Sequence, residues 1–256
     1  MVNVLSIIII VIMASSCSYT NIYEIKPIGT EIKDNNYFEF ENDTVKVTYS
    51  FWEDKGVMAF TFYNKLNIPV YIDWKKSSVI KNDEKIDYWA DETKTKSHSI
   101  NWYNNSRLFS GGNNLFNYAQ SSSESKSIRP ERITFISPRS SVTRIQSNLY
   151  NITPEKISSS TSGSILSRDG QKNFTVEFVE YTQESSQFIF RNFLTFSTSE
   201  KFDKEIYIDN GFYVSRINKI KTKKLEGVAV YNKKKDKIEY VKPITSAKEF
   251  YIDMGN

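Results

Sequence analysis

Apolar side chains recur at every second position over residues 45–51, and this period of two constrains the fold more than any other feature. The apolar positions are Val45, Val47, Tyr49 and Phe51, with polar residues between them. Successive side chains of a β-strand point to opposite faces, so the pattern predicts a strand with one buried face. Aromatic residues make up 14% of the chain, and rings suit a pleated, half-buried surface. We therefore expect an all-β protein.

Short turns separate this strand from two more strands, which predicts a meander. Residues 57–63 are apolar at both parities, as in a strand buried on both faces, and residues 68–74 alternate again. Further strands are expected at 86–89, 132–136, 142–146, 174–181, 188–196, 205–208, 212–220, 228–231 and 238–241. About ten strands at this spacing favour an antiparallel β-sandwich, immunoglobulin-like or larger.

One stretch of this pattern has a second interpretation. Phe212, Val214, Ile217 and Ile220 also fit one face of a helix. The preceding Asp209-Asn210-Gly211 is typical of a turn, and such a loop is also a weak candidate for calcium.

The strand pattern extends over residues 37–252, which we interpret as a single sandwich domain. Two small sandwiches divided near residue 130 are the alternative. Alternation fails over residues 91–130, and a structureless loop of about 40 residues is unusual in a compact domain. This stretch is therefore expected to be a long polar insertion. The serine-rich residues 158–164 are interpreted as a loop or linker.

Pro27 and Gly29 interrupt the pattern near the start of the chain. Residues 17–36 are accordingly interpreted as a membrane-proximal tether. The tether would connect the sandwich to whatever holds the first residues.

Residues 4–13 form an apolar run, which the small residues 14–16 and then Cys17 follow. A bilayer-spanning helix needs roughly 20 apolar residues, whereas a signal peptide has an apolar core of roughly 7–15. The arrangement resembles the lipobox signal of bacterial lipoproteins, although Ala14 stands where that family usually has leucine. The resemblance implies a signal peptide over residues 1–16 and lipidation of Cys17 with a diacylglyceryl group and an amide-linked chain such as palmitate.

An ordinary cleaved signal peptide and an uncleaved anchor are the alternatives. Ser18 after the cysteine, in place of aspartate, is similar to the pattern of lipoproteins sent to the outer membrane. We therefore expect a cell-envelope location, lipid-anchored at the outer membrane, on its periplasmic or surface face. Cys17 is the only cysteine, so no disulfide is expected.

Two further segments carry a resemblance: residues 45–52 read VKVTYSFW and residues 64–74 read NKLNIPVYIDW, with Ser77-Ser78 after them. With these segments, residues 38–80 resemble the opening of a group of uncharacterised bacterial envelope lipoproteins with immunoglobulin-like or sandwich domains. The resemblance implies a sandwich fold and an envelope location. It contains no motif that carries chemistry.

The charge balance makes nucleic acid an unexpected partner. The chain has 34 basic and 30 acidic residues, a net charge of +4, which is not the strongly basic footprint of a nucleic-acid-binding protein. The expected partner is the membrane, through the lipid anchor. An envelope protein or a glycan is the second candidate.

No catalytic residue, metal site or cofactor is predicted. His98 is the only histidine and lies in the polar insertion, where a loop residue is the simpler interpretation than a general base. One histidine and an acylated cysteine do not supply the usual ligands of zinc. A pair of carboxylates for glycoside hydrolysis cannot be recognised from sequence, so a carbohydrate hydrolase remains the alternative.

Trp102, Tyr103 and Asn104 in the insertion are the candidate ligand-contact residues. A ring offers a flat apolar face to the carbons of a sugar, and an amide offers hydrogen bonds to its hydroxyls. Anchoring the insertion in the core is the competing interpretation of the same rings. The sequence thus predicts a noncatalytic binding or structural module, with glycan binding as one form of it.

Overall fold

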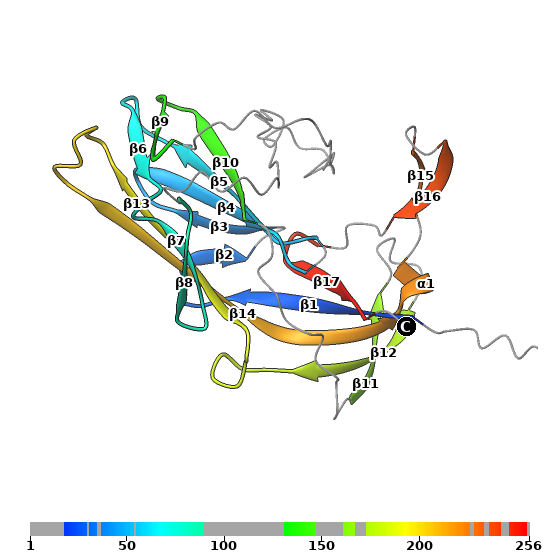
Figure 1. The fold of residues 1–256 in the computed structure, drawn as a ribbon. Helices are drawn as coiled ribbons and strands as arrows, with labels where there is room; N and C mark the ends of the chain where they lie inside the picture. Colours follow the sequence, from blue (N-terminus) through cyan, green and yellow to red (C-terminus); the bar gives the residue numbers. More distant parts are fainter. Residues whose placement is uncertain are drawn as a thin grey trace, which may run out of the picture.

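The protein is an antiparallel all-β sandwich, seen here in a computed structural model (Figure 1). The structure describes residues 18–29, 31–34, 37–53, 55–89, 131–146, 161–166, 173–225, 228–232, 236–241 and 246–254. Within these ranges the single helix is α1 (Thr222–Leu225), and no helix there has the length and apolar character needed to cross a bilayer. The predicted all-β class is confirmed.

Two sheets make up the sandwich. The larger has ten strands and curls along its length: β1 (Tyr19–Pro27), β6 (Val70–Asp73), β7 (Ser78–Lys81), β8 (Glu84–Asp87), β9 (Ile133–Ile136), β11 (Thr161–Leu166), β12 (Asn173–Glu180), β13 (Ile189–Ser197), β14 (Ile206–Lys221) and β17 (Glu249–Asp253). The smaller has five: β2 (Ile32–Asp34), β3 (Phe38–Glu41), β4 (Val45–Ser50), β5 (Met58–Asn64) and β10 (Ser141–Gln146). A separate hairpin consists of β15 (Val228–Asn232) and β16 (Lys237–Val241).

The 16-residue strand β14 organises the larger sheet. Its first half pairs with β13, and its second half lies between β1 and β12. A turn at residues 209–211 and a helical face over 212–220 were both plausible from sequence, and both are wrong. Strand β14 continues through these residues without a turn. Asn210 is buried, and the Tyr49 hydroxyl donates to its Oδ1 at 2.8 Å. Gly211 pairs with Arg191 in register.

The interpretation of residues 17–36 as a tether is wrong for most of its length. Tyr19–Pro27 is strand β1, hydrogen-bonded between β14 and β17, with Ile22, Tyr23 and Ile25 buried. Pro27 and Gly29 mark where this strand ends, and Gly29 takes a φ of +81° in the turn that follows. The predicted loop at 158–164 is also wrong in its second half, which begins β11.

Strands from both sides of residue 130 share both sheets. β5 pairs with β10 in the smaller sheet, and β6 pairs with β13 in the larger one. A division into two sandwiches near residue 130 is therefore wrong. The predicted meander is also wrong at its third strand, because β6 crosses to the other sheet and β3, β4 and β5 are the consecutive neighbours. The expected insertion at 91–130 lies outside the described residues.

Aromatic rings fill the space between the sheets. Phe212 is fully buried near their centre, with ring centroids of four neighbours within 5.6 Å. These neighbours are Phe38, Tyr49, Phe51 and Phe190. Because both sheets contribute rings, this cluster is one of the contacts that join them.

A chain of buried hydrogen bonds crosses the same interior. The Tyr88 hydroxyl donates to Oδ1 of Asn192 at 2.6 Å, and Nδ2 of Asn192 donates to the Tyr49 hydroxyl at 3.1 Å. Burial raises the pKa of both tyrosines, so both stay neutral donors at physiological pH. This series of hydrogen bonds fixes the lateral position of one sheet over the other through the bond between Asn192 and Tyr49.

Candidate binding groove on the outer face of the larger sheet

Strand β13 presents two different faces. Asn192, Leu194 and Phe196 point inward and are buried. Because side chains alternate along a strand, Arg191, Phe193 and Thr195 stand on the opposite, outer face of the larger sheet. Register places Tyr207 of β14 opposite Thr195 and Asp209 opposite Phe193 on that same face.

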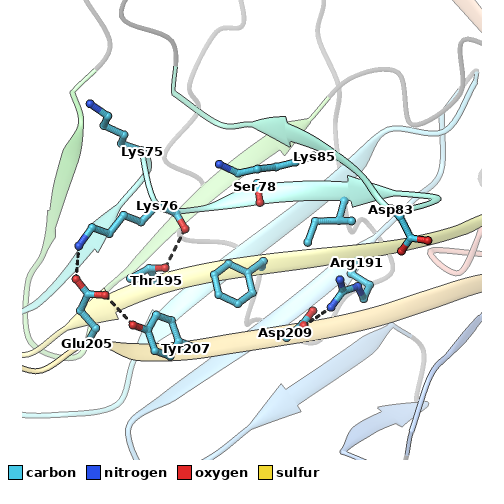
Figure 2. A pocket seen from close by; sticks show the side chains of 12 residues that line it. Lys75, Lys76, Ser78, Asp83, Lys85, Arg191, Thr195, Glu205, Tyr207 and Asp209 are labelled. Atoms are coloured by element: carbon cyan, nitrogen blue, oxygen red, sulfur yellow. Dashed lines mark hydrogen bonds and ion pairs between the residues drawn. The ribbon is translucent and has the colours of Figure 1, made fainter.

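An open groove of about 600 Å³ lies over this face, within the roughly 300–1,000 Å³ of small-molecule sites. We call it the outer groove (Figure 2). Its lining residues are Lys75, Lys76, Ser78, Ile80, Asp83, Lys85, Arg191, Phe193, Thr195, Glu205, Tyr207 and Asp209.

A tight hairpin between β7 and β8 builds one rim. Asn82 and Asp83 have φ of +43° and +69°, the left-handed pair that a two-residue type I′ turn requires. The side chain of Asn82 then binds the start of β13: Oδ1 accepts from the Ile189 amide at 3.1 Å, and Nδ2 donates to the Gln187 carbonyl at 2.9 Å. These two hydrogen bonds hold the hairpin, and with it Asp83 and Lys85, beside the groove.

The turn between β6 and β7 builds the other rim. Ser77 Oγ donates to the Asp73 carbonyl at 2.7 Å and accepts from the Thr195 amide at 3.0 Å. Thr195 Oγ1 donates to the Lys76 carbonyl at 2.9 Å. Nη2 of Arg132 donates to the buried Asp73 carboxylate at 2.8 Å. The hydrogen bonds with Thr195 therefore fix this turn to strand β13 of the larger sheet.

Lys76, Glu205 and Tyr207 form a chain of charge-assisted contacts along this rim (Figure 2). The Lys76 ammonium contacts Glu205 Oε1, and the Tyr207 hydroxyl donates to Oε2 at 2.7 Å. The hydrogen bond from Lys76 holds the pKa of Glu205 below its ordinary value, and the bond from Tyr207 adds to the effect. The Glu205 carboxylate in turn raises the pKa of Lys76 and of Tyr207.

Tyr207 is an exposed ring held in one orientation. Its side chain is 56% exposed, its hydroxyl is fixed by Glu205, and its ring stacks on Phe193 with centroids 5.7 Å apart and planes at 23°. A large apolar ring left in water without such restraints would sample several rotamers. The groove thus contains a pre-organised aromatic pair.

Arg191 and Asp209 form a second charged pair at the far end of the groove. Arg191 lies opposite Gly211 in register and reaches diagonally to Asp209. A Cβ at Gly211 would lie 3.2 Å from Ile28 and 3.6 Å from Arg191 Cγ. The glycine therefore leaves room for Ile28, whereas the contact with Arg191 would be an ordinary one.

The groove combines paired charges, hydroxyls and rings. A glycosidase general acid needs a raised pKa, whereas Lys76 lowers that of Glu205. In the described part of the chain, no three histidine, cysteine or acidic side chains gather closely enough to hold a metal ion.

Of the residues singled out from sequence, Cys17, His98, Trp102, Tyr103 and Asn104 are outside the described residues. Asp209, named from sequence as a weak candidate for calcium, lines the outer groove. Sequence reasoning did not predict the groove itself. The available signal was a ring, Phe193, at the outward parity of a strand whose other parity is buried. Its neighbours come both from the next strand, β14, and from β7, which is distant in sequence.

Fold and groove together define an antiparallel β-sandwich protein with an open groove, lined by charged pairs and rings, on the outer face of one sheet. Comparison with known proteins adds no relative. No family model matches the chain, and no curated protein or solved structure matches it.

The contacts of Glu205 with Lys76 and Tyr207 predict the direction in which its pKa is shifted. We expect its carboxyl to titrate below the ordinary 4.5 in the native chain and to return toward that value in Lys76→Met. Because the folded-state pKa is lowered, the pair stabilises the fold at neutral pH, and this contribution is lost as pH falls through that pKa. Carbon-13 NMR of glutamate-labelled protein measures the titration. Lys219→Met, which removes a lysine paired with Glu177 instead, should leave the Glu205 curve unchanged.

Proposed function

We propose that the protein is a lipid-anchored, noncatalytic binding module of a bacterial cell envelope, and that the outer groove is its binding surface. Tyr207 carries the binding part of the proposal. An exposed ring fixed by both a hydrogen bond and a stacked neighbour is already ordered, so a ligand that packs on it loses less conformational entropy on binding.

The sequence before β1 supports the anchor. An apolar run too short to span a bilayer precedes small residues and Cys17, in the order of a lipoprotein signal. Each buried methylene contributes about 0.8 kcal/mol, and two or more acyl chains make anchoring stable. β1 begins two residues after Cys17, so the lipid would hold the sandwich close to the membrane surface. The proposed location is the outer membrane.

The electrostatics of the groove favour binding over catalysis. Two of its carboxylates, Glu205 just before β14 and Asp209 on β14, each contact a cation on a neighbouring element. Lys76 holds the pKa of Glu205 below its ordinary value, so this carboxylate orients a ligand hydroxyl well but is a poor proton donor. The outer groove therefore fits recognition of a ligand better than hydrolysis of one.

Replacing the cysteine tests the anchor. In the native host, the mature protein should begin at Cys17, carry acyl chains by mass spectrometry and fractionate with the membrane. Cys17→Ala should abolish acylation and release the protein from the membrane fraction, whereas Ser18→Ala should keep both. An unmodified cysteine in wild type, with residues 1–16 either removed or retained, would contradict the proposed anchor.

A further inference from the structure

The outer groove is close to electroneutral. Lys75, Lys76, Lys85 and Arg191 line it, against Asp83, Glu205 and Asp209. Lys85 also contacts a fourth carboxylate just beyond the lining, Asp87, at 2.6 Å. Four cations therefore face four carboxylates. A site for phosphate or sulfate would present an excess of positive charge, so this balance argues against an anionic ligand.

The groove is nevertheless rich in polar groups of fixed direction. Thr195 is held by two hydrogen bonds, Glu205 by Lys76 and Tyr207, and Asp209 by Arg191. An ionised carboxylate has about four lone-pair positions, and a guanidinium has five donors, so one partner leaves capacity for others. Paired groups like these can bind hydroxyls without first being desolvated as isolated charges.

Apolar surface lies in the middle of these polar groups. Phe193 stands on the central strand, opposite Ser78 of β7 and Asp209 of β14, and its ring stacks on that of Tyr207; Ile80 of β7 also lines the groove. The ligand that matches this surface has an apolar face and a rim of uncharged hydroxyls. That combination is the chemistry of a sugar ring, whose C–H groups pack on an aromatic face while its hydroxyls meet carboxylates and guanidinium groups.

We propose that the outer groove binds a neutral glycan, with Tyr207 and Phe193 as the stacking pair and Glu205, Asp209 and Arg191 as the hydroxyl-binding groups. The inference rests on the proposed function and names its ligand class. The groove is open rather than enclosed, so it accommodates internal sugar units of a chain as well as an end.

Direct binding tests the ligand class. The probes are cellohexaose, chitohexaose, maltohexaose and the neutral polysaccharide fraction of the host envelope, with a sulfated hexasaccharide as the anionic comparison. The full-length acylated protein is held in phosphatidylcholine nanodiscs, and saturation-transfer NMR and calorimetry report binding. We expect at least one neutral probe to bind and the sulfated probe to bind more weakly or not at all.

Matched variants locate the site. Tyr207→Ala should weaken binding by about tenfold or more, because it removes the exposed half of the stack. Tyr207→Phe keeps the ring and should stay within about threefold of wild type. Phe135→Ala truncates an equally exposed ring, 55% against 56%, on a strand that does not line the groove, and should change nothing. Equal losses in the Tyr207→Ala and Phe135→Ala variants would overturn the site.

A photo-crosslinking residue in place of Lys85, which lines the groove without being one of the proposed binding groups, is introduced in the native host. If no neutral glycan binds but position 85 crosslinks to an envelope protein, the ligand class is wrong and the binding function stands. If only the sulfated probe binds, the ligand class is likewise wrong. If no probe binds and nothing crosslinks, both the glycan inference and the assignment of the groove as a binding surface fail.

Discussion

Phe212→Ala is expected to lower the free energy of unfolding by about 3–5 kcal/mol, the usual cost of truncating a buried phenylalanine. The residue is fully buried, and the rings around it belong to both sheets. Truncation removes apolar surface from the core and leaves a cavity that neighbouring strands cannot close, because each is fixed in register. Urea denaturation followed by circular dichroism measures the loss.

Tyr207→Ala is the matched control for this result. It removes a ring of similar size from the same strand, β14, but from the exposed outer face. Its effect on stability should stay within about 1 kcal/mol, whereas its effect on ligand binding should be large. A Phe212→Ala variant no less stable than Tyr207→Ala would show that the sheets are not held together at this cluster.

The strands most accurately predicted from sequence are those whose two faces differ. β4 alternates buried and half-buried positions, and its predicted bounds differ from the observed ones by one residue. β1 was not predicted, although Ile22, Tyr23 and Ile25 are buried. Pro27, its last residue, and Gly29 after it were interpreted as breaks in the strand pattern, and the strand before them was overlooked. A proline at the end of a strand is compatible with that strand.

The order of the strands in each sheet could not be predicted from local sequence patterns. The predicted meander assumed that consecutive strands pair, yet β6 leaves β5 to pair with β13, more than a hundred residues away in sequence. Hydrophobic alternation reports which face of a strand is buried, but not which neighbour supplies the covering side chains. Strand partners depend on complementary packing among many residues at once.

The same limit explains why the outer groove was missed. Tyr207 and Glu205 are two residues apart, so their contact is local, but Lys76 reaches Glu205 from a turn far away in the sequence. Parity along β13 places Phe193 on the outer face, but only the register and the ring contact show that it stacks against Tyr207. Local patterns favoured Trp102 and Tyr103 because their rings and amides are adjacent in sequence.

The buried hydrogen-bond chain at Asn192 provides the second large effect. Asn192→Leu should lower the free energy of unfolding by about 1–3 kcal/mol, because the Tyr88 hydroxyl then lacks its acceptor in the interior. The Tyr49 hydroxyl is less affected, since it still donates to Asn210 at 2.8 Å. Chemical denaturation of the purified protein at neutral pH measures the change.

A second substitution should reverse part of this loss. Tyr88→Phe in the Asn192→Leu background removes the stranded hydroxyl, and replacing both partners with apolar groups of similar shape is close to neutral. The double variant should therefore be more stable than Asn192→Leu alone, although it departs further from the native sequence. A double variant that loses the sum of the two single effects would show that these groups act independently. The hydrogen bond between Tyr88 and Asn192 would then contribute nothing to stability beyond packing.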